Sequence, residues 1–125
     1  MLFDAVNVIV GNQISGNGAD TADAATPGPT GINVFGVSPI TGTIIAQNVF
    51  QQESYEVVVN TPAQVDVHLN NFLDTTVGVD NLGAGTSNAV VNWWACADGP
   101  GTSGCASVGG PGVLFAPWLT HPFPN

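Results

Sequence analysis

The feature that most constrains this chain is a recurring triplet of an Asn, any residue and a large apolar residue. The steps from Asn48 to Asn70 and from Asn70 to Asn92 are both 22 residues, whereas the step from Asn12 to Asn48 is 36 and contains an insertion. A fixed period of this size is typical of a solenoid in which each repeat forms one coil. The triplets are Asn12-Gln13-Ile14, Asn48-Val49-Phe50, Asn70-Asn71-Phe72 and Asn92-Trp93-Trp94.

Apolar residues recur at two fixed offsets from these Asn residues, and we expect each set to stack from coil to coil inside a β-solenoid. The Asn itself is expected at a tight corner, because Asn tolerates left-handed backbone. Its amide can also bond the next Asn in the stack. The alternative is that four such triplets arise by chance in an Asn-rich chain. The two sets are Ile9, Ile45, Val67 and Ala89 before the Asn, and Ile14, Phe50, Phe72 and Trp94 after it.

Short strand patterns separated by Gly, Pro or Asn run along the whole chain, and no segment has apolar residues at helical spacing over two turns. The prediction is an all-β solenoid of about four coils of about 22 residues. Residues 1–125 are expected to form a single domain. Within it, residues 16–30 are the inserted loop, expected to face solvent, and residues 95–125 are a disulfide loop and a C-terminal cap.

The charge balance excludes several classes of partner. The chain has no Lys and no Arg, nine acidic residues and a formal net charge of −9. Without cations it cannot neutralise phosphates, so neither nucleic acid nor an anionic membrane surface is an expected partner. No apolar run of 18 residues is present, so no membrane insertion is expected. Zinc usually needs four ligands, and His68 and His121 lack ligand spacing, so no metal or other cofactor is expected.

The two cysteines, Cys96 and Cys105, flank a loop rich in Gly and Pro. Such a pair is typical of a disulfide rather than of a metal site. A bridge across this loop would contribute about 2–3 kcal/mol to stability in the loop-entropy model, and it implies an oxidising compartment. The alternative is two reduced, unpaired thiols.

The C-terminal third carries a distinctive motif that begins at Asn92. It reads N-W-W-A-C (92–96), G-P-G (99–101), G-C (104–105) and V-L-F-A-P-W-L (113–119). This segment resembles the end of bacterial right-handed parallel β-helix repeat proteins, in which N-W-W-G-C, G-P-G and G-C close the helix and an F-x-P-W-L strand follows. Here Ala95 replaces the usual Gly, which should not alter the fold.

The resemblance implies a right-handed parallel β-helix with the architecture of pectate lyases and pectin hydrolases, in a family with many secreted or surface proteins. Known members are much longer, so the chain looks like the C-terminal part of one. The first strand pattern, Val6–Val10, begins at once, so we expect an open N-terminal coil that receives another copy or the upstream part of a longer chain.

The catalytic residues of related enzymes are not matched here. Family lyases use a basic residue, and this chain has none. Family hydrolases use Asp residues on neighbouring coils, but one coil from Asp66 lie Ile44 and Asn88, and no carboxylate column exists in strict register. Glu53 and Asp74 are one residue out of register, and we interpret that pair as a solvated turn rather than as the two spaced carboxyls of a glycosidase.

Three further features are possible functional sites, and each favours a simpler interpretation. His68 lies on the opposite face from Val67, which favours an exposed His over a general base. By the same alternation Trp93 points outward, where it is a weak candidate for stacking on a sugar ring, although packing beneath the C-terminal segment competes. Asp20 and Asp23 in the insertion lack the pattern of a dedicated calcium loop.

The sequence therefore predicts a secreted or cell-surface β-helix with a structural, adhesive or self-assembling role and no catalytic site of its own. Its expected partners are another copy or the upstream part of a longer chain, and polysaccharide is a further candidate. The alternative function is the C-terminal portion of a carbohydrate-binding or polysaccharide-degrading β-helix enzyme.

Overall fold

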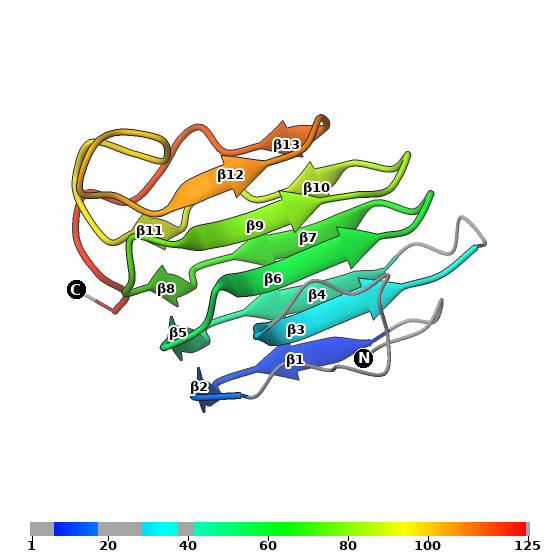
Figure 1. Cartoon of the computed structure of the whole chain (residues 1–125), viewed down its shortest axis with the longest axis horizontal. Helices are drawn as coiled ribbons and strands as arrows, with labels where there is room; N and C mark the ends of the chain where they lie inside the picture. Colours follow the sequence, from blue (N-terminus) through cyan, green and yellow to red (C-terminus); the bar gives the residue numbers. More distant parts are fainter. Residues whose placement is uncertain (1–6, 18–28, 38–41, 125) are drawn as a thin grey trace.

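The computed structural model describes residues 7–17, 29–37 and 42–124, and in these residues the only regular secondary structure is short β-strands (Figure 1). Thirteen strands occur in this part of the chain. They are β1 (Val8–Val10), β2 (Gln13–Ser15), β3 (Thr30–Phe35), β4 (Thr43–Ala46), β5 (Val49–Gln51), β6 (Tyr55–Asn60), β7 (Val65–His68), β8 (Asn71–Phe72), β9 (Val77–Asn81), β10 (Ser87–Asn88), β11 (Trp93–Trp94), β12 (Ser107–Gly109) and β13 (Val113–Leu114).

The strands form three parallel sheets, and every third strand returns to the same sheet. Sheet 1 has the order β1-β4-β7-β10-β13, sheet 2 the order β2-β5-β8-β11, and sheet 3 the order β3-β6-β9-β12. The predicted all-β parallel solenoid is therefore confirmed. The four strands of sheets 2 and 3 span about three turns, so the expectation of about four coils was slightly high. The difference arises because four strands stacked in one sheet are separated by only three full turns of the chain.

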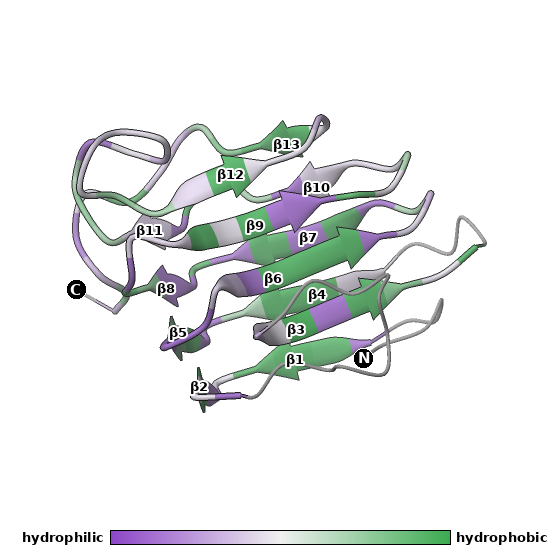
Figure 2. Ribbon diagram, viewed as in Figure 1, coloured by the Kyte–Doolittle hydropathy of each residue, from purple (hydrophilic) through white to green (hydrophobic). Residues whose placement is uncertain are grey.

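The two predicted apolar stacks are present and fill the interior. Strand register places Ile9 beside Ile45 and Ile45 beside Val67 in sheet 1. In sheet 2, Phe72 lies between Phe50 and Trp94, with ring centroids 5.5 and 4.8 Å away. All three rings are fully buried. Burying such rings contributes roughly 2–3 kcal/mol each, so the stacks supply much of the stability. The apolar stretches of the strands are visible in Figure 2.

The four Asn residues form a hydrogen-bonded ladder along one corner, between sheets 1 and 2. Asn70 shows the pattern: its Oδ1 accepts the backbone N–H and the Nδ2 of Asn48 at 3.0 and 3.1 Å. Its own Nδ2 donates to the carbonyl of Ile45 at 2.9 Å and to Oδ1 of Asn92 at 3.0 Å. Every donor and acceptor of this buried side chain is thus used, as a buried amide requires.

The expected reason for Asn at this corner was partly wrong. The left-handed backbone belongs to the residue before each Asn, because that residue makes the bend while the Asn side chain turns inward to the ladder. Only the first of these four bending residues is a glycine. They are Gly11, Gln47, Leu69 and Val91, with φ of 75°, 58°, 57° and 53°.

The long connections of the solenoid leave at a different corner, between sheets 2 and 3. The insertion predicted at 16–30 lies between β2 and β3, although residues 18–28 are outside the described part of the chain. The loop that contains the disulfide lies between β11 and β12. The two central coils cross this corner in a few residues, 52–54 and 73–76. The two longest connections therefore lie at one edge of the solenoid.

The segment that follows β12 continues along the last coil as part of a further turn. Strand β13 pairs in parallel with β10, and the backbone hydrogen bonds extend past both strands. The predicted C-terminal cap falls on this segment, which covers the ladder at Asn92. The bonds are Ala89 N to Leu114 O, Val91 N to Pro117 O, and Leu119 N to Asn92 O, at 2.7, 2.7 and 2.9 Å.

Removing one amide from the middle of the ladder should be costly. Replacing Asn70 with Ala would leave four hydrogen-bonding groups on Ile45, Asn48 and Asn92 short of a partner in a buried site. Unsatisfied buried groups cost about 1–3 kcal/mol each before relaxation. We expect N70A to lower the free energy of unfolding by about 4 kcal/mol in urea denaturation.

The exposed end of the ladder provides the control. Asn12 is exposed and makes its ladder bonds with one neighbour only. We expect N12A to lower the free energy of unfolding by less than about 1 kcal/mol, because Oδ1 of Asn48 keeps the backbone N–H of Asn12 and Val10 is exposed to water. Equal losses in the two variants would contradict a ladder whose strength depends on burial.

Candidate functional site

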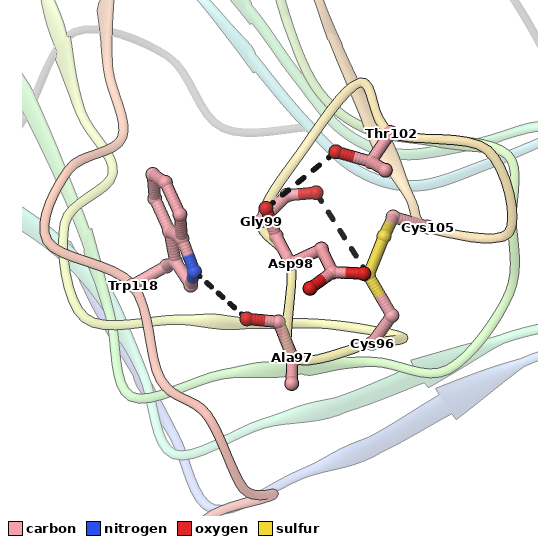
Figure 3. The surroundings of a disulfide bond; sticks show 7 residues. All are labelled: Cys96, Ala97, Asp98, Gly99, Thr102, Cys105 and Trp118. Carbon is pink, nitrogen blue, oxygen red and sulfur yellow. Dashed lines mark hydrogen bonds between the residues drawn. A yellow bond between two sulfur atoms is a disulfide. The ribbon is translucent and has the colours of Figure 1, made fainter.

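The disulfide predicted between Cys96 and Cys105 is formed, with the two Cα atoms 5.2 Å apart. Trp118 lies across the loop it closes, and its indole Nε1 donates to the carbonyl of Ala97 at 3.0 Å (Figure 3). The ring sits so close to Gly99 that an added Cβ there would lie 2.5 Å from it. Phe115 packs on the same ring, with centroids 6.3 Å apart. The loop and the C-terminal segment are therefore fastened to each other.

Trp93, the candidate for sugar stacking, lies in β11 and is half-buried. Its in-register neighbour is Asn71, whose side chain holds the backbone of Phe123 by two hydrogen bonds of 2.6 and 2.8 Å. The C-terminal segment therefore passes over sheet 2 beside Trp93. This placement favours the competing interpretation, in which Trp93 packs beneath that segment.

Three carboxyl groups, which we call the acidic corner, lie at the corner between sheets 2 and 3, where the charges of two of them act on the third. They are Glu53, Glu56 and Asp74. Oε1 of Glu53 accepts the backbone N–H and the Nδ2 of Asn17 at 3.0 and 2.6 Å. Asp74 accepts the backbone N–H of Gln52. The interpretation of Glu53 and Asp74 as a solvated turn was wrong for Glu53, which is only 3% exposed, because the Asn17 backbone folds over it.

Glu56, in β6, is the most unusual member of the acidic corner. It is 0% exposed, and neither carboxyl oxygen has a hydrogen-bond partner among the described residues. Burial, followed by the negative charges of Asp74 and Glu53, raises the pKa of Glu56 from 4.5 to about 8. Glu56 is therefore mostly protonated at neutral pH.

Sequence reasoning missed Glu56 because it stands in a strand pattern, Tyr55–Asn60, that is otherwise apolar. A signal was available in the register. One coil before and after Glu56 lie Gly31 and Gly78, and a side chain at either would collide with the aromatic stack, at Phe50 and at Trp94. An acidic residue flanked by two glycines in adjacent coils marks a crowded position rather than a solvated one.

His68 and Asp66 share the outer face of sheet 1. His68 Nε2 lies 3.9 Å from Asp66 Oδ1, and Gln64 and Asn88 place their amide nitrogens 3.1 and 3.4 Å from the same oxygen. His68 is half-buried rather than exposed. The predicted neighbours of Asp66 are confirmed, because Ile44 and Asn88 flank it in register.

Asp80 has one neighbour that differs from the expected one. The 22-residue period pairs it with Val58, as observed, and with Thr102, which is not observed. Gly109 takes that place because the disulfide loop adds residues to the last coil. Burial raises the pKa of Asp80. No strand-borne pair of carboxylates faces across neighbouring coils in the described residues.

Residues 7–17, 29–37 and 42–124 contain no group of three or more His, Cys, Asp or Glu side chains that could hold a metal ion. Asp20 and Asp23, weighed as calcium ligands, lie outside the described residues. In the same part of the chain there is no helix of the length and apolarity needed to cross a bilayer.

The chain matches no protein-family model, no curated protein and no solved structure. The parallel β-solenoid therefore stands on the geometry alone. The resemblance of residues 92–119 to bacterial β-helix repeat proteins stays a prediction.

The disulfide should contribute measurably to stability. In the loop-entropy model, a bridge between residues nine positions apart lowers the conformational entropy of the unfolded chain. This stabilises the folded protein by about 2–3 kcal/mol. We expect the double variant Cys96→Ala and Cys105→Ala to lose about this much free energy of unfolding in urea. A loss below about 0.5 kcal/mol would mean that Trp118 and the loop backbone already hold the closed form.

Ala95 should be a site of backbone strain. It follows β11 with a φ of 65°, where Gly is the residue without steric cost. We expect Ala95→Gly to raise the free energy of unfolding by about 0.5–1 kcal/mol. Gly104→Ala is the opposite control, because its φ is 87° with open space around the added methyl, so that change should be destabilising.

Proposed function

We propose that this protein is an extracytoplasmic structural β-solenoid that assembles with a second copy of itself through the N-terminal end of its ladder. The observation that carries the proposal is that the two ends of the Asn ladder differ. At one end Asn92 is buried, and its Nδ2 donates to the carbonyls of Val67 and Ala89, each at 2.7 Å. At the other end Asn12 is exposed, and its Oδ1 accepts no hydrogen bond from the described residues.

The apolar stacks are asymmetric in the same direction as the ladder, because their side chains are more exposed at the Asn12 end. The central members Ile45 and Phe50 are fully buried, whereas Ile9 and Ile14, at the Asn12 end, are only half-buried. Val8 in the edge strand β1 is 64% exposed. An edge strand beside partly exposed apolar side chains is a template for another chain. Lys and inward-pointing charges are the usual blocks to such pairing, and the chain has no Lys.

A second copy fits this end because the surface is self-complementary. Both copies would offer an exposed Asn amide, which donates and accepts, between two apolar residues. Closed two-fold contacts between identical surfaces are the commonest form of self-association. The opposite end is occupied by the segment after β12, so the proposed contact joins two N-terminal ends rather than building a head-to-tail filament.

The compartment follows from the disulfide, since such bonds persist in oxidising environments outside the cytosol. Secretion or surface display is the finer proposal, supported by the resemblance of residues 92–119 to bacterial β-helix repeat proteins. The second candidate function is the C-terminal portion of a carbohydrate-active β-helix enzyme. Its support is the same resemblance, and its catalytic coils would lie upstream.

The proposed contact can be tested by sedimentation. The charge of −9 opposes association, and salt above about 0.1 M screens it within about 10 Å. We expect the chain to be a monomer at low salt and a dimer at high salt and high concentration. A strict monomer at high salt would contradict the proposal and leave the upstream part of a longer chain as the partner.

A matched pair of variants locates the contact. Val8→Lys places a charge on β1, at one edge of sheet 1, and Leu114→Lys places the same charge on β13, at the other edge. Both side chains are exposed, at 64% and 54%. We expect V8K to remain a monomer at high salt and L114K to dimerise like the original chain. If only L114K blocks association, the contact lies at the C-terminal end, and the proposed contact is wrong.

A further inference from the structure

We propose that the acidic corner is a proton-operated clasp. With Glu56 protonated, Glu53 holds the backbone of Asn17 at the start of the insertion; with Glu56 ionised, the corner opens and releases Asn17. This device is independent of the self-association proposed above, because the acidic corner lies between sheets 2 and 3 and the ladder lies between sheets 1 and 2.

The first support is the burial of Glu56 without any compensating group. Its side chain is fully buried, and both oxygens lack a partner among the described residues. The chain contains no Lys and no Arg, so neither of these side chains can offset a negative charge there. An isolated buried carboxylate is strongly unfavourable, and such a group either stays protonated or moves to water.

The second support is the charge of the surroundings. From the two loops that cross the corner, Glu53 and Asp74 face Glu56, and both are acidic. On the neighbouring strands, β3 has no titratable side chain, and β9 has only Asp80, which is acidic as well. Ionisation of Glu56 therefore places a buried negative charge near other acidic side chains, and no described neighbour favours the ionised form.

The third support is the way in which the corner holds Asn17. Oε1 of Glu53 accepts both Asn17 bonds, at 3.0 and 2.6 Å, while its buried Oε2 has no partner among the described residues. Glu53 is held from the other side by its backbone carbonyl, which accepts the hydroxyl of Thr76 at 2.9 Å. Asn17 is exposed, so it can part from Glu53 and let water reach that carboxyl group.

The sign of the pH dependence follows from the shift. The pKa of Glu56 is about 8 in the closed corner and about 4.5 when the group is exposed. Opening therefore releases a proton between these values, so opening becomes more favourable as pH rises through that window and levels off above about 8. The clasp is tightest under acidic conditions.

Hydrogen exchange of the Asn17 amide measures the clasp directly. We expect its protection factor, corrected for the intrinsic exchange rate, to fall by up to about tenfold per pH unit from about 5 to about 8. In Glu56→Gln, which is neutral and of the same size, protection should not change with pH. The Asn12 amide, in the same coil as Asn17, is the internal control, because it donates to the neutral side chain of Asn48 in the next coil.

A second measurement covers the case in which E56Q does not fold. The side-chain carbonyl shift of Glu56 should titrate near pH 8 in the original chain and at a lower pH in Asp74→Asn, which removes one of the neighbouring charges. Asp98→Asn, in the disulfide loop, should leave the midpoint in place. A midpoint near 4.5 in the original chain would overturn the clasp.

Two further outcomes would overturn the proposal. The first is an equal fall of Asn17 protection in the original chain and in E56Q, since the corner would then open for a reason other than Glu56. The second is restoration of protection at pH 9 by millimolar calcium in the original chain but not in E56Q, which would make the corner a cation site.

Discussion

The structure depends on a column of buried Asn amides in which every donor and acceptor needs a hydrogen-bond partner. Asn48, Asn70 and Asn92 have almost no exposed surface, and each uses both its amide hydrogens and its oxygen within the ladder. A buried amide without partners would cost several kcal/mol, so the ladder tolerates only one register of one coil on the next. That register in turn places the aromatic rings of sheet 2 on one another and fixes the interior.

A column of this kind has a direction, and the direction gives the molecule two unlike ends. Each Asn accepts from the coil before it and donates to the coil after it. The last Asn closes the series by donating within its own coil, and the segment from β13 onward extends over it. At the first Asn, Asn12, the side-chain Oδ1 accepts no hydrogen bond from the described residues. The proposed self-association and the tolerance of this end to substitution both follow from that asymmetry.

The absence of cations shapes the rest of the chain. Ion pairs with Lys or Arg are impossible, so carboxyl groups are held by backbone N–H groups and amides, as at Glu53, or are buried in protonated form, as at Glu56. The first arrangement favours the charged form and the second the neutral form. Their meeting at one corner, where the insertion begins, makes that corner sensitive to pH while the ladder corner, built from neutral amides, is not.

The sequence by itself determined the solenoid. The equal spacing of three Asn residues and the apolar residues at fixed offsets predicted the parallel register and both stacks, because a coil that repeats must place like residues above one another. The spacing of Cys96 and Cys105 predicted the bridge. The tertiary structure alone decided the left-handed residue at each corner, the burial of Glu53, and the neighbour of Asp80. Strict periodicity could not supply these, because insertions shift the register and because burial depends on which loop folds over a side chain. Glu56 is the clearest case: its position in the strand was evident, but its environment required the glycines, aromatic rings and carboxyl groups of the adjacent coils to be placed around it.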